Sequence, residues 1–523
     1  MSTSFRSLAA ASLVVMLGFV ASRILGLVRN MAILSQFGAG REYEAYLAAI
    51  AIPDLVFQVL AGGAVGSAFI PVFKSYFARG EERDAWRLTN SVVTLAFVAT
   101  LPVAVLLATF ARPVVDHLVV PGWDPSSKDL TAHLMRIMLV SPVIFAVSGF
   151  ATSVLNSFQK FAWAALAPVF YNLAIIVAAL VARPLGLGIQ AVAVGVAAGA
   201  GLHLLVQVPS LLAQGFRFRP TIDLGLSGVR EVARLMGPRM IGLGVVQLNQ
   251  VVNVVLASFL VVGSIGFLNV AWLMIMSPLT LAMAVSTAVF PTLAAESALE
   301  RREEVRRLFM LAFRMIVFLT VPASIGLIAL SEPIIRLFFE RGEFGPESTR
   351  MTAFALRFYA LGLVGHATVE IVDRVFYAFH DTWTPVKIAM GAIAANLVLS
   401  LVLMRTPLNY GGLALANALA AVAEGGGLVW LLSRKMRSAG GEGLGLVQIG
   451  DGLGRIALAA AIMGVVVVLL REVLFQWIEL APTLEHAIVL TLCVAAGAVT
   501  YLVLARTLGV DEVTSLWRLI RGR

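Results

Sequence analysis

Two arginines, Arg23 and Arg29, interrupt an apolar segment that runs from about Leu8 to Phe37 and carries no other charge. A charged side chain near the centre of a bilayer costs roughly 3 kcal/mol, so such residues usually face a protein interior or a water-filled cavity. In a helix, their spacing separates the two guanidiniums by about 9 Å along the axis and about 120° around it. The pair could therefore bind an anion at two depths of one cavity. Alternatively, each arginine could reach the membrane interface or pair with a buried carboxylate.

The composition places this segment in a membrane protein. Of 523 residues, 59% are hydrophobic and 13% are charged, whereas soluble domains carry about 25% charged residues. Apolar runs of about 20 residues, each long enough to cross a bilayer as a helix, recur along the chain. We therefore expect an all-α polytopic membrane protein, with the first apolar segment retained as a helix rather than cleaved as a signal peptide.

The apolar runs predict about fourteen transmembrane helices. Their expected ranges are 8–37, 44–73, 88–111, 131–157, 162–182, 187–212, 235–260, 264–295, 308–330, 351–378, 385–404, 411–433, 453–474 and 484–505.

The distribution of basic residues predicts the orientation of these helices. With the N-terminus in the cytoplasm, 24 lysines and arginines fall in cytoplasmic segments and 9 in outer segments. Cytoplasmic loops carry such an excess in membrane proteins. Both termini are therefore expected in the cytoplasm. The net charge of +9 is explained by topology and anionic lipids, and no nucleic-acid partner is expected.

A faint internal repeat predicts how the helices are grouped. Ala68-Phe69-Ile70-Pro71 ends the second expected helix, and Ala288-Val289-Phe290-Pro291 ends the eighth, 220 residues later. A displacement by six helices preserves orientation, so the two lobes should be related by a pseudo-two-fold axis along the membrane normal. We expect an N-lobe at 1–220 and a C-lobe at 221–440, each with six helices. Residues 441–523 should supply two further helices and a cytoplasmic tail.

Enzymatic chemistry finds little support in the sequence. No two of the six histidines have metal-ligand spacing, and the single cysteine, Cys493, cannot form an internal disulfide. A phosphate-binding glycine loop followed by lysine is absent from the sequence. We therefore expect a protein that is not an enzyme and has no metal and no cofactor.

Short motifs in register along the chain resemble one known family. They are Ser22-Arg23-Ile24-Leu25-Gly26, Arg29, Phe37-Gly38-Ala39-Gly40, Pro53, Ala68-Phe69-Ile70-Pro71, Gly237-Pro238, Asn253, Ala257-Ser258-Phe259, Phe290-Pro291, Arg374, Phe376-Tyr377-Ala378, Asp381-Thr382 and Thr384-Pro385-Val386. Together they resemble the bacterial lipid II flippases, the MurJ/MviN family. This family belongs to the multidrug/oligosaccharidyl-lipid/polysaccharide exporter superfamily.

The resemblance implies a cargo, a location and a role for the arginine pair. Members move an undecaprenyl-pyrophosphate-linked peptidoglycan precursor, lipid II, from the inner to the outer leaflet of the cytoplasmic membrane by alternating access. Arginines matching Arg23 and Arg29 line the N-lobe cavity of these proteins. Guanidinium groups suit a pyrophosphate because they form charge-assisted, often bidentate hydrogen bonds. Besides this cargo, membrane lipids and the cell-wall synthesis machinery are the expected partners.

The chain also departs from the family pattern. Phe57-Gln58 and Ala271-Trp272-Leu273 stand where two further cavity arginines are usual, and Met276 replaces an acidic residue. Asp54 replaces the usual asparagine beside Pro53. With fewer cations, the cavity should bind pyrophosphate more weakly or use Gln58, Asn249 and Asn253 as neutral donors. The acidic residue that some members use for sodium in the seventh helix is missing.

Two other groups of charges are candidate site residues. Glu44 matches an acidic family position and could pair with an arginine in one state, or be a solvated residue at a helix start. Glu370 and Arg374 share a helix face at i,i+4 spacing, with Asp373 beside them. For this trio an internal ion pair is favoured over a substrate site.

The function predicted from these observations is lipid II flipping. A related exporter of another lipid-linked oligosaccharide or of a drug is one alternative. A membrane scaffold that does not transport is another. A drug exporter would favour a cavity rich in carboxylates, whereas the first helix here supplies arginines.

Overall fold

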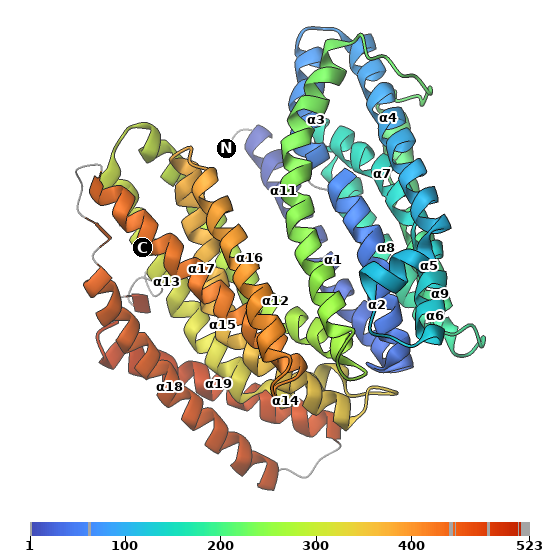
Figure 1. Ribbon diagram of the computed structural model, residues 1–523. Coiled ribbons are helices and arrows are strands. Elements are labelled where there is room, and N and C mark those ends of the chain that lie inside the picture. The colour runs from blue at the N-terminus through green and yellow to red at the C-terminus, as the bar shows by residue number, and fades with distance from the viewer. Residues whose placement is uncertain are drawn as a thin grey trace. The chain divides into compact units, whose positions relative to one another are not determined.

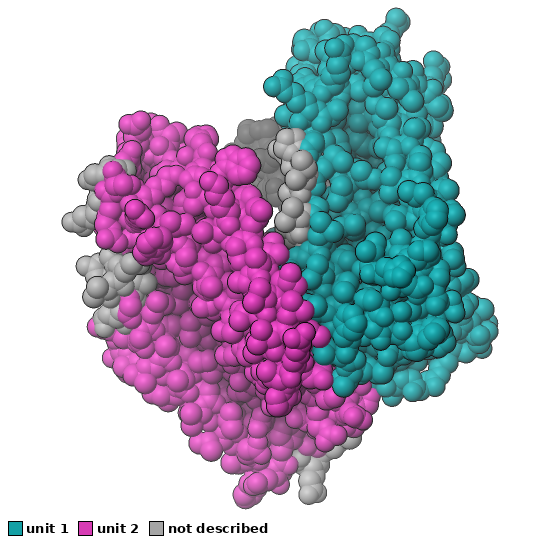
Figure 2. Space-filling view, viewed as in Figure 1, with its two compact units in different colours: residues 1–266, 341–344 teal, residues 267–340, 345–523 magenta. Residues whose placement is uncertain are grey.

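The computed structural model describes residues 3–60, 64–438, 443–444, 446–477, 482–510 and 512–513, and their regular secondary structure is helical. Figure 1 shows long helices that carry the chain back and forth. The chain divides into two compact units, coloured in Figure 2. Unit 1 comprises Met1–Gly266 and Arg341–Phe344, and unit 2 comprises Phe267–Glu340 and Gly345–Arg523. The lobe boundaries at 220 and 440, which rest on the sequence repeat, stay a prediction.

Unit 1 is built from the first eleven α-helices and one π-helical turn. They are α1 (Thr3–Phe37), α2 (Arg41–Leu60), α3 (Ala64–Ala78), α4 (Glu82–Thr109), α5 (Ala111–Val114), η1 (Val115–Val119), α6 (Pro125–Met138), α7 (Val140–Ser157), α8 (Phe161–Ala182), α9 (Gln190–Leu205), α10 (Val208–Ala213) and α11 (Ser227–Ala257). Helix α1 packs along α8, which packs along α9, while α2 contacts α6, α7 and α11.

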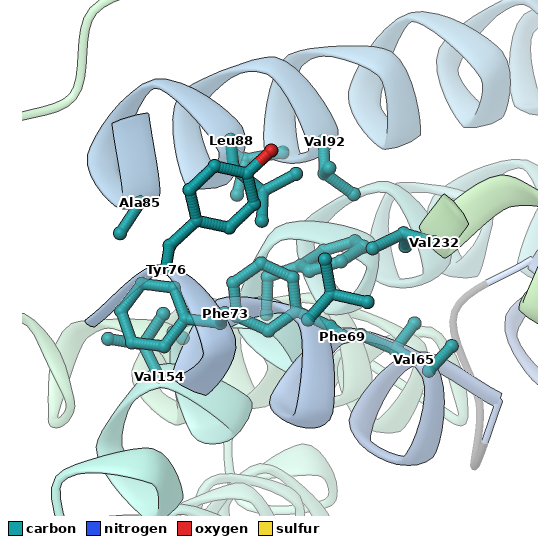
Figure 3. Packing of buried hydrophobic residues seen from close by; sticks show 14 of the residues in the cluster. Val65, Phe69, Phe73, Tyr76, Ala85, Leu88, Val92, Val154 and Val232 are labelled. Atoms are coloured by element: carbon teal, nitrogen blue, oxygen red, sulfur yellow. The ribbon is translucent and has the colours of Figure 1, made fainter. Parts of the chain in front are cut away.

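Aromatic side chains fill the core where α3, α4 and α7 meet. Phe69 and Phe73 of α3 are fully buried, and the Phe69 ring meets Phe150 of α7 edge-on at 5.5 Å. The Phe73 ring contacts Trp86 of α4 at 5.6 Å. Figure 3 shows this cluster, to which α11 contributes Val232. Such ring pairs add about 0.5–1.5 kcal/mol each beyond their buried area. The start of α11 therefore packs on a well-ordered aromatic core.

The segment from Phe216 to Asp223, which leads into α11, is bonded along α4. Buried Asn90 donates from Nδ2 to the carbonyl of Arg217 at 3.2 Å and accepts the Arg219 N–H at 2.9 Å. Arg87 forms an ion pair with Asp223 at 2.7 Å. We call residues 216–223 the strap. It holds the start of α11 against α4.

Unit 2 contains the remaining helices. They are α12 (Ser264–Ala298), α13 (Arg302–Ala329), α14 (Ser331–Phe339), α15 (Pro346–Ala378), α16 (Trp383–Leu403), α17 (Tyr410–Ser438), α18 (Leu446–Trp477) and α19 (Pro482–Thr507); the first residues of α12, up to Gly266, belong to unit 1. Helices α15 and α17 pack closely, because a Cβ added to Gly362 would lie 2.6 Å from the Cα of Ala418. Small residues at a crossing let backbones approach in this way.

The predicted membrane architecture is confirmed. Within the described residues, thirteen helical stretches are long and apolar enough to cross a membrane. They match thirteen of the fourteen predicted ranges, with ends that differ by a few residues at most termini. The prediction at 235–260 falls on α11, which is helical from Ser227 to Ala257, although some of its side chains lie outside the described residues.

Candidate functional site

Helix α1 presents its two arginines differently. Arg23 is exposed, and its guanidinium carbon lies 5.2 Å from the centre of the Phe19 ring, one turn earlier. Arg29 is half-buried, and its Nε is buried with no hydrogen-bond partner in the described part of the chain. A buried donor without an acceptor is costly. Arg29 is therefore the better prepared of the two to accept an anionic ligand.

Four polar side chains from two other helices act electrostatically on Arg29. It interacts electrostatically with Tyr43, Tyr46 and Asp54 of α2 and with Tyr171 of α8. The Tyr43 and Tyr46 rings stack with their centres 6.3 Å apart. One guanidinium with neighbouring phenol hydroxyls can donate several hydrogen bonds to a phosphate group. We call Arg29, Tyr43, Tyr46, Asp54 and Tyr171 the Arg29 cluster.

The sequence predicts a role for Arg29 and marks Asp54 as a departure from the family, whereas the three tyrosines are found only in the structure. The spacing of residues 43 and 46 on one helix was visible, whereas the approach of Tyr171 from α8 was not.

The neutral candidates Gln58, Asn249 and Asn253 also belong to unit 1. Gln58 lies one turn after Asp54 on α2, and the two asparagines lie one turn apart on α11, which packs against α2. All three are half-buried, and their amides form no hydrogen bond with other described residues. The six predicted substrate-binding residues thus share one unit, and their binding of cargo stays a prediction.

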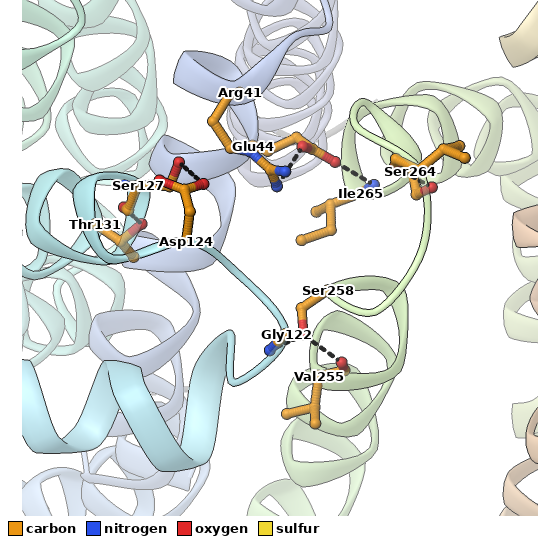
Figure 4. A network of polar contacts seen from close by, with 11 residues as sticks. Arg41, Glu44, Gly122, Asp124, Ser127, Thr131, Val255, Ser258, Ser264 and Ile265 are labelled. Atoms are coloured by element: carbon orange, nitrogen blue, oxygen red, sulfur yellow. Dashed lines mark hydrogen bonds and ion pairs between the residues drawn. The ribbon is translucent and has the colours of Figure 1, made fainter.

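Glu44 lies at the start of α2, as expected, but it is buried rather than solvated. Its carboxylate pairs with Arg41 at 3.2 Å and accepts the N–H of Ile265 at 2.9 Å (Figure 4). Ile265 is in the first turn of α12, where unpaired N–H groups and the helix dipole favour a negative charge. Glu44 therefore caps α12. The structure does not bring it together with Arg23 or Arg29.

The charged trio of α15 forms one ion pair. Arg374 Nη2 lies 3.7 Å from Glu370 Oε2, as the helical spacing predicts. Asp373 interacts electrostatically with both residues and with Glu424 of α17, and its Oδ1 is buried without a partner among the described residues. Within the described residues, no group of three or more histidine, cysteine or acidic side chains could hold a metal ion.

Asp381, which belongs to a motif of the family resemblance but had no predicted role, joins two helices. It accepts hydrogen bonds from the backbone N–H and hydroxyl of Thr384, and from Lys435 of α17 at 2.5 Å. Partial burial would raise the pKa of Asp381, but the bonds from Lys435 and Thr384 outweigh it and hold that pKa below its usual value. The Asp-Thr-x-Thr-Pro motif therefore starts α16 and ties it to α17.

Replacing Asp381 with alanine is expected to destabilise the protein by about 1–2 kcal/mol, because a helix cap and a charge-assisted bond are lost. The folded-state pKa is lowered, so the bonds stabilise the protein above the unfolded pKa of about 4. This stabilisation is lost as the pH falls through the lower folded pKa. Thermal unfolding in detergent at several pH values measures both effects. Lys435→Met, which keeps the Thr384 bonds, should cost less. Unchanged midpoints for both variants would contradict the assignment.

Comparison with known proteins places this arrangement in a family. The model of the lipid II flippase MurJ family matches residues 33–485. A probable lipid II flippase MurJ of Haemophilus influenzae is 32% identical over 422 residues, which is 76% of this chain and 81% of that protein. A solved lipid II flippase MurJ in an inward closed conformation is 25% identical, with a TM-score of 0.78 over 98% of this chain and all of that one.

A more distant structure has the same fold. It is an inward-facing multidrug resistance MATE family transporter of the MOP superfamily, 15% identical, with a TM-score of 0.65 over 78% of this chain and 93% of that one. The family model spans most of the chain, and a relative above 30% identity covers three quarters of it. The chain therefore belongs to the MurJ lipid II flippase family.

Proposed function

We propose that this protein flips lipid II, moving the undecaprenyl-pyrophosphate-linked precursor from the inner to the outer leaflet of the bacterial cytoplasmic membrane. The observation that carries the proposal is Arg29, a half-buried guanidinium in the first helix whose Nε faces no acceptor among the described residues. Family membership supports the same cargo. Arg29 and the neighbouring phenols bind the pyrophosphate, and Arg23 supplies a second positive charge about two turns away.

The orientation and the transport cycle are part of this proposal. The excess of lysine and arginine in alternate loops supports a cytoplasmic location for both termini. Alternating access lets a polar headgroup cross without exposure to lipid, while the polyprenyl tail stays in the bilayer. Arginine rather than carboxylate at the first helix favours an anionic cargo over a cationic drug.

Complementation of a bacterial strain depleted of its own lipid II flippase tests the function. The wild-type chain is expected to restore growth and cell shape. Arg307→Ala, which removes an exposed arginine that pairs with Glu304 three residues earlier on α13, is the matched control and should restore growth equally. Failure of a wild-type chain that is present in the membrane at normal levels would contradict lipid II as the cargo. Growth restored with lipid II still retained in the inner leaflet would favour another lipid-linked oligosaccharide.

A further inference from the structure

Hydrogen bonds to α4 hold the strap in an extended conformation. Asn90 bonds to the carbonyl of Arg217 and to the N–H of Arg219, and the hydroxyl of Thr94, one turn later, accepts the N–H of Thr221 at 3.3 Å. Every second residue of the strap therefore turns its backbone towards α4, as a β-strand does towards its neighbour. Side chains of such a chain alternate between two faces, so residues 218, 220 and 222 share one face.

This face of the strap is apolar and exposed. It consists of Phe218, Pro220 and Ile222; Phe218 is 53% exposed and Ile222 is 51% exposed. Exposed apolar side chains that are grouped in this way mark a contact with another protein or with a membrane. The position on α4 favours the membrane, because α4 is a candidate membrane-spanning helix whose exposed apolar residues begin at Phe97, one turn beyond Thr94. The apolar face thus lies where the lipid-facing surface of α4 begins.

The other face of the strap carries two arginines. Arg217 and Arg219 are exposed, and their guanidiniums form no hydrogen bond and no ion pair with other described residues. Asp223, the acidic residue of the strap, is already paired with Arg87 at 2.7 Å. Two positive charges therefore remain beside the apolar face. This combination is typical of segments that lie in the interface of a membrane that contains anionic lipids.

We propose that the strap is a docking surface for anionic phospholipids of the bilayer. Phe218 and Ile222 insert between the headgroups, while Arg217 and Arg219 bind the lipid phosphates. The lipid then holds the strap from outside, as Asn90 and α4 hold it from inside. This inference goes beyond the proposed function and does not depend on the cargo, so a failed complementation leaves it open to test.

The charge is tested with the variant Arg217→Gln/Arg219→Gln, which leaves the backbone bonds to α4 in place. Purified protein in detergent is titrated with phosphatidylglycerol or phosphatidylcholine, and bound lipid is measured by native mass spectrometry. The wild type is expected to bind phosphatidylglycerol more tightly than phosphatidylcholine. The variant should bind phosphatidylglycerol about 30-fold more weakly, because each arginine near an anionic lipid contributes about fivefold. Its affinity for phosphatidylcholine should not change.

Arg350→Gln/Arg405→Gln is the matched control. It removes two exposed arginines of unit 2 that likewise have no side-chain partner in the described part of the chain. This variant should bind phosphatidylglycerol like the wild type.

A spin label tests whether the apolar face enters the bilayer. The single cysteine, Cys493, is buried and is replaced by alanine, and Phe218→Cys supplies the labelling site. In bilayers with phosphatidylglycerol, the label should collide more often with oxygen, which concentrates in lipid, than with a water-soluble nickel chelate. Arg83→Cys, in the first turn of α4 and about 10 Å before Asn90, is the control position and should show the reverse.

Three results would overturn the docking surface. The first is equal affinity of the wild type for the two phospholipids. The second is a loss of phosphatidylglycerol binding that is as large in the control variant as in the strap variant, since any surface arginine would then have the same effect. The third is a label at residue 218 that meets the nickel chelate as often as the label at residue 83.

Discussion

Replacing Arg29 with alanine is expected to abolish complementation and to weaken the binding of undecaprenyl pyrophosphate by about 30- to 100-fold. A hydrogen bond to a charged group contributes about 1.5–3 kcal/mol, and each 1.4 kcal/mol is a factor of ten in affinity. The loss should be large because Arg29 is the cation of its cluster. The sequence also has Phe57-Gln58 and Ala271-Trp272-Leu273 where the family resemblance predicts two further cavity arginines. Growth and in vitro binding measure the effect.

Two matched substitutions separate charge from geometry. Arg29→Lys keeps the positive charge and loses the planar fork, so it should recover part of the affinity. Arg23→Ala removes an exposed arginine that rests on Phe19, and its effect should be smaller than that of Arg29→Ala. Full complementation by Arg29→Ala, at a membrane level equal to that of the wild type, would show that the arginine mechanism is wrong even for a working flippase.

Replacing Glu44 with alanine is expected to destabilise the protein by about 3 kcal/mol. The substitution leaves the buried N–H of Ile265 without its acceptor and Arg41 without its carboxylate. Breaking a buried pair on one side costs about 3–5 kcal/mol, and the partial exposure of Arg41 places the expectation at the low end. The thermal midpoint and the yield of folded protein in detergent measure the loss.

Glu44→Gln is the control for this prediction. It keeps an oxygen that can accept the Ile265 N–H and removes the charge, so about half of the stability should return. Equal stability of the alanine variant and the wild type would mean that the contact contributes nothing to folding. Normal stability with lost complementation would instead favour a role for Glu44 in transport.

The membrane helices could be predicted because length and apolar composition are local properties. A helix crosses the bilayer when about 20 apolar residues follow one another, and neighbours elsewhere in the chain do not change this. The start of α11 was the hardest helix boundary to predict. The helix begins at Ser227 within a basic segment, and its first turns pack on α3 and α4. Its first turn depends on Tyr76, whose hydroxyl accepts the N–H of Gly228 at 3.1 Å. No local pattern predicts this.

The candidate site could be predicted only in part. Arg23 and Arg29 stood out because charge in an apolar segment is costly wherever it occurs. The i,i+4 pair of Glu370 and Arg374 also followed from a single helix. By contrast, the cap that Glu44 provides for Ile265 joins residues 221 positions apart, and Tyr171 approaches Arg29 from another helix. Such contacts depend on which helix faces meet, and one sequence does not specify that.

The strap limits how the start of α11 can move relative to α4. Asn90 bonds to the backbone of Arg217 and Arg219 as a neighbouring β-strand would, and Arg87 pairs with Asp223, only four residues before the start of α11. A connection that is bonded at several points along α4 has little freedom to extend or to rotate. The start of α11 should therefore move together with α4 as one rigid piece. Extra residues inserted into the strap would let α11 move independently of α4, while every helix stays intact.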